Sequence, residues 1–146
     1  MVIVPTPLDV HRNRRDAASG RPPTLVWVGR AENLDYLELL RPAVVSLTRR
    51  WPELRLRVIC SDFPQWPEVR IEKLRWSAAA EVDGLATADI GLMPLSDDEW
   101  TRGKCGSKAL QYMGLGIPAV CSPVGANCDI IEHGRSGLLP VSPDEW

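Results

Sequence analysis

The sequence predicts an α/β domain with a Rossmann-like parallel sheet and helices on both faces. Short apolar runs alternate with segments of helical periodicity, and short loops join them. This alternation is typical of parallel β-α-β units. A loop with two glycines and two lysines, Gly103 to Lys108, directly precedes one expected helix. In parallel sheets ligands bind beyond the carboxyl ends of the strands, so this loop is the first candidate site.

Length and composition fit one ordinary globular domain. The chain has 146 residues, of which 45% are hydrophobic and 25% are charged. A net charge of −2 argues against nucleic-acid binding by bulk electrostatics. No apolar run approaches the ~20 residues of a membrane span and the start lacks a signal-peptide pattern, so a cytoplasmic chain is expected. The cysteines have no CxxC spacing and are expected to be free thiols outside any metal site: Cys60, Cys105, Cys121 and Cys128.

Residues 1–23 are expected to form an interdomain connector or linker. Val2 to Asp9 is apolar but is broken by two prolines, which favours an extended segment. His11 to Pro23 is basic and polar and ends in two further prolines, as linkers commonly do. The binding domain proper is therefore expected over residues 24–146.

The first strand and helix are expected directly after this connector. Thr24 to Gly29 is an almost continuous apolar run, the pattern of a buried parallel strand. Asn33 can cap the helix that follows, whose apolar residues recur at helical spacing until Pro52. Pro42 lies inside this pattern and predicts either a kink or a late helix start.

Two further strands are expected before the middle of the chain. Leu54 to Cys60 alternates apolar and basic residues, which predicts a strand with one buried face. Val69 to Trp76 is the third strand, although its alternation slips in the middle. Ser77 can cap a helix that runs to about Ala86, with Glu81 in its early turns.

The second half of the chain repeats this alternation. Asp89 to Leu95 is a short apolar strand, and Ser96 to Arg102 is expected to be an acidic loop. The cradle loop, as we call Gly103 to Lys108, leads into a short helix, a tight turn and a buried strand at Ile117 to Ser122. The remaining expected elements are a short helix from Asn127 or Cys128 to about His133 with Gly134 as its C′ residue, a strand at Gly137 to Val141, and the start of a helix at Pro143 to Trp146.

The cradle loop has the chemistry of an anion site. The first N–H groups of a helix have no partner within it, and together with the helix dipole they favour a phosphate. The two lysines add positive charge, and the two glycines let a ligand approach the backbone. Gly29-Arg30 follows another strand and is expected at the same rim of the sheet. The alternative is that the glycines only turn the chain and the lysines are solvated.

Several longer motifs support a more specific assignment. They are Pro94-Leu95-Ser96-Asp97-Asp98-Glu99-Trp100, Gly103-Lys104-Cys105, Gln111-Tyr112-Met113-Gly114-Leu115-Gly116-Ile117-Pro118, Ser122-Pro123-Val124-Gly125, Ile130-Ile131-Glu132-His133-Gly134 and Gly137-Leu138-Leu139. Together they resemble the donor-binding half of retaining GT-B glycosyltransferases of family 4, also called group 1. The likeness covers nearly the whole chain and is strongest from Ala88 to Leu139. It implies the C-terminal half of a GT-B fold, with the N-terminal acceptor domain absent.

The resemblance implies a nucleotide-sugar donor held between two domains, with its diphosphate on this one. The expected diphosphate-binding residues are Gly29, Arg30, Lys104, Gly106, Ser107 and Lys108. Gln111 is expected at the ribose, and Arg75 and Trp76 are expected at the base. No metal and no cofactor are implied, since the nucleotide-diphosphate sugar is the substrate. The catalytic residues are unassigned, because part of the catalytic environment belongs to the missing domain.

Two positions depart from the family pattern. Most members have two glutamates eight positions apart where this chain has Gly103 and Gln111. A glutamine can still hydrogen-bond a diol, but without the charge. The lysine that usually follows the Gly29-Arg30 turn is also missing, and Lys104 is the candidate to replace its charge. Members with the Gly-Lys-Cys and Gln-Tyr-Met variants form a recognisable subgroup.

The predicted function is donor binding within a two-domain hexosyltransferase that acts on a glycan or lipid-linked acceptor in polysaccharide biosynthesis. The fragment alone is expected to be inactive, because transfer requires both substrates to be positioned together. The expected partners are a nucleotide sugar and the acceptor domain of the parent, not nucleic acid, and a membrane-peripheral parent is compatible with this role.

Two alternative functions stay open. One is a Rossmann-like or flavodoxin-like module that binds nucleotide or phosphate for regulation, without catalysis. Gly29-Arg30-Ala31-Glu32 lacks the Gly-x-Gly-x-x-Gly fingerprint that would favour this module. The other alternative is a structural domain that binds no ligand.

Overall fold

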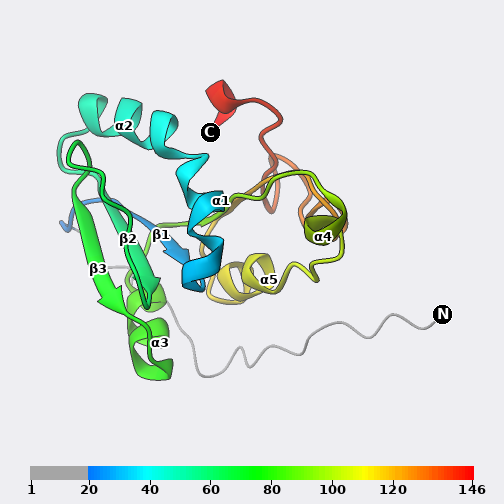
Figure 1. The fold of residues 1–146 in the computed structure, drawn as a ribbon, viewed down its shortest axis with the longest axis horizontal. Coiled ribbons are helices and arrows are strands. Elements are labelled where there is room, and N and C mark those ends of the chain that lie inside the picture. The colour runs from blue at the N-terminus through cyan, green and yellow to red at the C-terminus, as the bar shows by residue number, and fades with distance from the viewer. Residues whose placement is uncertain (1–19) are drawn as a thin grey trace.

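The protein is built on a sheet whose neighbouring strands all run parallel, and Figure 1 shows the strands of its first half side by side. The computed structural model describes residues 20–146, and within them the sheet has six strands in the order β3-β2-β1-β4-β5-β6. The strands are β1 (Thr24–Val28), β2 (Arg55–Cys60), β3 (Ile71–Arg75), β4 (Ile90–Met93), β5 (Ala119–Cys121) and β6 (Gly137–Leu138). The chain runs outward from β1 to β3 and then crosses back to β4. The predicted parallel Rossmann-like sheet is therefore confirmed, and its strand order reverses between β1 and β4.

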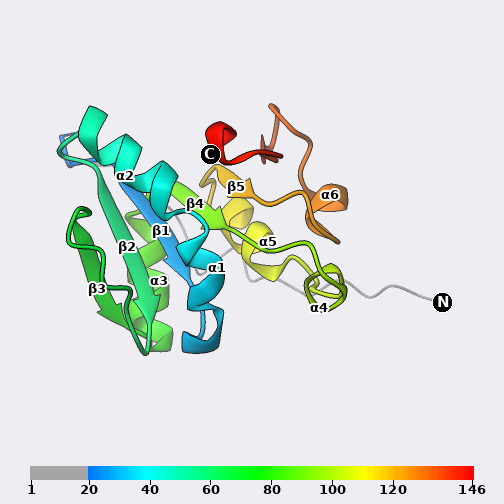
Figure 2. The ribbon, with the colours of Figure 1, turned by 45° about the horizontal axis from the view of Figure 1, so that its top comes forward.

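Helices cover both faces of this sheet, as predicted. The helical segments are η1 (Ala31–Asn33), α1 (Leu34–Glu38), α2 (Arg41–Arg50), α3 (Ala78–Ala86), α4 (Glu99–Arg102), α5 (Ser107–Gly114), α6 (Asn127–Ile130) and η2 (Pro143–Glu145). Figure 2 shows α1 and α2 in front of the strands and α3 behind them. Within residues 20–146, no helix is both long enough and apolar enough to cross a membrane.

Two hydrophobic cores lie on opposite faces of the sheet. Alternate residues of β1 divide between them, because successive side chains of a strand point to opposite faces. Leu25 and Trp27 pack with α1 and α2, whereas Val26 and Val28 pack with α3 and α5. This double burial explains why β1 is an unbroken apolar run.

Strand β2 is buried more completely than its alternation predicts. Five of its six residues are buried, not only one face, because β2 lies between β1 and β3 with helices on both sides. Arg57 is 8% exposed, and its guanidinium hydrogen-bonds Glu72 Oε2 at 3.0 and 3.1 Å, Thr87 Oγ1 at 2.7 Å and the Gly84 carbonyl. The charge is tolerated inside the sheet because it is paired and hydrogen-bonded.

The residues just before β1 are docked against the sheet. The Arg21 guanidinium donates two hydrogen bonds to Asp89, at 2.9 and 2.8 Å. Asp89 Oδ2 also accepts the backbone N–H of Thr24 at 2.8 Å. Arg21 thus ties the end of the expected connector to the segment that enters β4. Val2 to Asp9 and most of the expected linker lie outside the described residues, so the domain boundary stays a prediction.

The segment after β1 forms the 3-10 turn η1 and two α-helices, α1 and α2, instead of one helix. Neither a kink nor a late start describes it fully: α1 begins directly after Asn33, and α2 begins at Arg41 with Pro42 in its first turn, where the missing N–H has no intrahelical role. Asn33 occupies the N-cap position of α1, but its side chain makes no capping hydrogen bond. Ser77 does cap α3, since its Oγ accepts the N–H of Ala80 at 3.1 Å.

The sequence prediction of an acidic loop at Ser96 to Arg102 is wrong, because this segment contains the helix α4. Asp98 caps this helix by accepting the Thr101 N–H at 2.8 Å, and Thr101 Oγ1 accepts the Asp98 N–H at 3.1 Å. This reciprocal pair is a capping box, which stabilises the start of a helix within the acidic segment.

The expected helix toward His133 ends earlier than predicted. Helix α6 stops at Ile130, because Ile131 adopts extended backbone and buries its side chain in the core. Gly134 is therefore not a C′ residue; it lies in the following turn with φ +78° and donates to the Gly137 carbonyl. His133 Nδ1 accepts the Leu139 N–H at 3.0 Å, which fixes this turn to the chain beyond β6.

Candidate functional site

An open cavity of about 660 Å³ lies where the strand order reverses, beyond the carboxyl ends of β1 and β4. Its walls come from the turn after β1, from α1, from the start of α3, from the end of β4 and from the cradle loop. This volume falls within the range of small-molecule sites. The lining residues are Trp27, Val28, Gly29, Arg30, Asn33, Tyr36, Trp76, Glu81, Leu92, Met93, Pro94, Leu95, Gly103, Lys104, Cys105, Gly106, Ser107 and Lys108.

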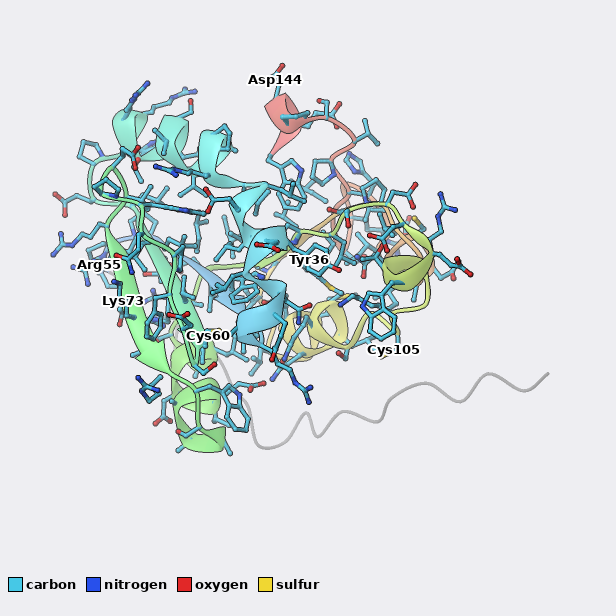
Figure 3. The ribbon with its side chains drawn as sticks, viewed as in Figure 1. Tyr36, Arg55, Cys60, Lys73, Cys105 and Asp144 are labelled. Atoms are coloured by element: carbon cyan, nitrogen blue, oxygen red, sulfur yellow. The ribbon has the colours of Figure 1, made fainter. Side chains whose placement is uncertain are left out.

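The sequence-predicted phosphate residues come together at this cavity. Gly29 and Arg30 follow β1, and Lys104, Gly106, Ser107 and Lys108 belong to the cradle loop and the start of α5; all six line it. Segments about seventy positions apart in the sequence therefore line the same cavity. Figure 3 shows Tyr36 on α1 and Cys105 in the cradle loop near α5.

Gly106 gives the cradle loop its shape. It is the N-cap of α5 and has φ +68°, a left-handed conformation that side chains disfavour. A Cβ at this position would also overlap Ile130 Cδ1. The glycine therefore lets the backbone turn sharply into α5, whose first N–H groups have no intrahelical acceptor.

Packing requires a glycine at position 29. A Cβ at Gly29 would overlap the ring of Trp27, which turns back beneath it. The Gly29 N–H donates to the Ile59 carbonyl at 3.2 Å, so the turn is fixed to β2. Arg30 follows with its side chain exposed at the rim of the cavity.

The Lys104 side chain is held by two residues of the segment that follows β1. Its Nζ lies 3.5 Å from Asn33 Oδ1 and 5.0 Å from the centroid of the Tyr36 ring. The second distance is a cation–π contact. The Asn33 side chain thus accepts a hydrogen bond from Lys104 instead of capping α1. Asn33, Tyr36 and Lys104 all line the cavity.

Glu81 is the functional candidate that the sequence interpretation missed. Its Oε1 accepts a hydrogen bond from Gln111 Nε2 at 2.6 Å and lies 3.6 Å from Lys108 Nζ, and its Oε2 accepts from Trp76 Nε1. Burial opposes ionisation, but the hydrogen bonds from Gln111 and Trp76 and the charge of Lys108 outweigh it, so the pKa of Glu81 lies below its ordinary value. The topology of the fold could have indicated Glu81, because it lies in the first turn of α3, and the first turns of a helix that follows a parallel strand lie near the ligand-binding edge of the sheet.

The three residues expected at the nucleoside are placed differently from one another. Trp76 lines the cavity, with its indole half-exposed and held by Glu81. Gln111 and Arg75 are not among the lining residues. Gln111 lies behind Glu81, and Arg75 is exposed at the end of the edge strand β3. The ribose and base assignments stay predictions.

Two of the acidic residues beside the cradle loop, Asp97 and Asp98, make structural contacts. Arg102 Nε donates to Asp97 Oδ1 at 2.7 Å, and Asp98 caps α4. Hydrogen bonds from Arg102 lower the pKa of Asp97, and hydrogen bonds from Ser96 and the Thr101 backbone lower that of Asp98. Within the described part of the chain, no group of three or more His, Cys, Asp or Glu side chains is arranged to hold a metal ion.

The sequence is similar to known glycosyltransferases. The family described as "Glycosyl transferases group 1" matches residues 22–146, and the chain belongs to this family. A D-inositol 3-phosphate glycosyltransferase of Pseudarthrobacter chlorophenolicus is 30% identical, over 79% of this chain and 30% of the relative. The chain therefore spans about a third of the length of that curated relative.

Solved structures carry the same fold. The C-terminal domain of a group 1 family glycosyl transferase from Francisella tularensis superposes with a TM-score of 0.70 at 14% identity, over 94% of this chain and 83% of that domain. The pneumococcal O-GlcNAc transferase, solved in complex with UDP and GlcNAc, gives a TM-score of 0.56 at 20% identity, over 92% of this chain and 28% of that one. The fold is that of a GT-B C-terminal domain, as the resemblance implied.

Proposed function

We propose that this chain is the donor-binding domain of a retaining glycosyltransferase of the hexosyltransferase type. Its donor is a nucleotide-diphosphate sugar, and its parent enzyme transfers the sugar to a glycan or lipid-linked acceptor in polysaccharide biosynthesis. One observation carries this proposal: residues that sequence alone assigned to a diphosphate lie around a single cavity at the strand-order reversal. Open α/β sheets bind nucleotides at such points.

The charge distribution of the cavity suits a diphosphate. Arg30, Lys104 and Lys108 surround it, and the N-terminus of α5 adds backbone N–H groups and a favourable dipole. Lys108 is partly neutralised by Glu81 at 3.6 Å. Arg30 and Lys104 therefore supply most of the uncompensated positive charge.

The family relationship supports a sugar donor rather than a free nucleotide. The pneumococcal neighbour was solved with UDP and GlcNAc, and the curated relative is named a glycosyltransferase. Because the chain spans about a third of that relative, the acceptor domain is proposed to lie in the remainder of a two-domain parent. The donor then lies between the two domains, with its diphosphate on the one described here.

Calorimetric or NMR titration with UDP, GDP and ADP, and with their sugar forms, tests donor binding. We expect weak binding of one nucleotide series and chemical-shift changes around the cradle loop. No binding of any of them would overturn the proposal. Transfer assays separate the domain from its parent: the parent should transfer sugar, and the 146-residue chain alone should not, because half of the reaction cleft is missing.

A further inference from the structure

Glu81 lies where three parts of the candidate site meet. Trp76, expected at the base, donates to one of its carboxylate oxygens, and Lys108, expected at the diphosphate, lies 3.6 Å from the other. In a nucleoside diphosphate the ribose connects the base to the phosphates. A ligand that places its base at Trp76 and its phosphates at Lys108 therefore brings its ribose to Glu81.

Glu81 also has the chemistry that a ribose requires. The vicinal hydroxyls of a ribose are donors that need acceptors, whereas the charged groups around the cavity, Arg30, Lys104 and Lys108, can only donate. Among the described residues that line the cavity, Glu81 is the only carboxylate. A carboxylate has about four acceptor positions. Gln111 and Trp76 take two of them, and Lys108, at 3.6 Å, lies beyond hydrogen-bond distance, so about two positions are left for a diol.

Gln111 is placed to act on Glu81 and not on the ligand. Its amide donates to Glu81 Oε1 at 2.6 Å, and it does not line the cavity. Gln111 and Trp76 approach the carboxylate from α5 and from the end of β3, one at each oxygen. These two donors fix the carboxylate plane before a ligand arrives, and preorganisation of this kind reduces the entropy lost on binding.

We propose that Glu81 accepts hydrogen bonds from the ribose hydroxyls of the donor nucleotide, and that Gln111 is a positioning residue that holds Glu81. This inference rests on the proposed function, and it moves the ribose contact from α5 to α3. The carboxylate that most family members carry at the Gln111 position is thereby supplied from a different helix.

The test compares nucleotides that differ only in the ribose. The probes are the best-binding member of UDP, GDP and ADP, its 2′-deoxy and 2′,3′-dideoxy forms, and inorganic pyrophosphate, each titrated calorimetrically into the 146-residue chain. We expect the wild type to prefer the ribonucleotide over the dideoxy form by roughly 10- to 100-fold, the scale of hydrogen bonds to a charged acceptor. Glu81→Gln should reduce this preference to a few-fold without weakening pyrophosphate binding, because it removes a negative charge beside Lys108. Gln111→Leu should reduce it partially.

The matched control is Asp83→Asn, an exposed carboxylate on the same helix, which should keep the wild-type preference. Urea unfolding of each variant verifies that it is folded, and Glu81→Ala gives a second substitution should Glu81→Gln unfold. An unchanged ribose preference in a folded Glu81 variant overturns the inference. So does a change confined to the choice among UDP, GDP and ADP, because Glu81 would then serve the base. A wild type that binds none of the nucleotides overturns the proposed function itself.

Discussion

Lys104 Nζ lies 5.0 Å from the centroid of the Tyr36 ring, so a charge of the cradle loop is held by the helix that follows β1. This contact joins the two walls of the cavity. We expect Tyr36→Leu to weaken diphosphate binding by about 0.5–2 kcal/mol, because it removes a cation–π interaction that orients the ammonium. Calorimetric titration with UDP and pyrophosphate measures the change.

Tyr36→Phe is the matched control for this prediction. It keeps the ring and therefore the cation–π contact, so binding should stay close to that of the wild type. Equal affinities for Tyr36→Leu and the wild type would mean that Asn33, 3.5 Å from Lys104 Nζ, is sufficient to position the lysine.

The second prediction concerns the two charges that face the expected diphosphate. Arg30→Ala and Lys104→Ala should each weaken nucleoside-diphosphate binding by roughly 1–3 kcal/mol, the scale of hydrogen bonds to charged groups. Binding should also fall with rising salt, and less steeply in each variant. Exposed Arg135, which pairs only locally with Glu132, provides a control substitution of equal charge. A double variant that binds as well as the wild type would contradict the assignment.

The sequence predicts the sheet well because its signals are local. Buried parallel strands are apolar runs, and the capping serine at Ser77 and the glycines of the cradle loop mark helix starts within a few residues. The details that it misses depend on distant neighbours. Arg57 reads as a solvent-facing residue, yet it is buried because Glu72 and Thr87 arrive from other elements. Ser96 to Arg102 reads as a loop because it is short and acidic, and its helix α4 depends on the reciprocal Asp98–Thr101 capping pair.

The same reasoning applies to the site. The phosphate residues follow strand ends and can be grouped by topology alone. The contact of Glu81 with Gln111 spans thirty positions and depends on how α3 and α5 pack on the sheet, which no spacing in the sequence encodes. The family pattern assigns the ribose to Gln111, which does not line the cavity, and gives no role to Glu81, which does.

The third prediction separates two constraints on the glycine at the start of α5. Gly106 and Gly116 have nearly equal positive φ angles, +68° and +70°, but a Cβ would overlap Ile130 at Gly106 and would meet nothing within 4 Å at Gly116. Gly116→Ala should therefore cost about 1 kcal/mol of unfolding free energy, the cost of the left-handed backbone. Gly106→Ala should cost roughly 2–4 kcal/mol, because overpacking is added. Urea denaturation measures both, and equal costs would show that Ile130 moves aside freely.

The last prediction concerns the charge at position 111. The family pattern alone predicts that Gln111→Glu is tolerated, but Gln111 Nε2 lies 2.6 Å from Glu81 Oε1, so the substitution brings two carboxylates together. Such a pair shares a proton, and the pKa of one member rises. A carboxylate whose pKa is raised in the folded state destabilises the protein as the pH rises through that value, because the folded state then holds the extra proton.

The wild type should behave in the opposite sense. The pKa of Glu81 lies below its ordinary value of 4.5, so Glu81 contributes stability that is present above pH 4.5 and is lost as the pH falls through the lower, folded value. Urea midpoints measured between about pH 3 and 8 should therefore show a loss with rising pH that is specific to Gln111→Glu. Adding Glu81→Gln to that variant should abolish the loss, because a single carboxylate then faces an amide again. If Gln111→Glu follows the wild-type pH profile, the two side chains do not share the contact from which the role of Glu81 is argued.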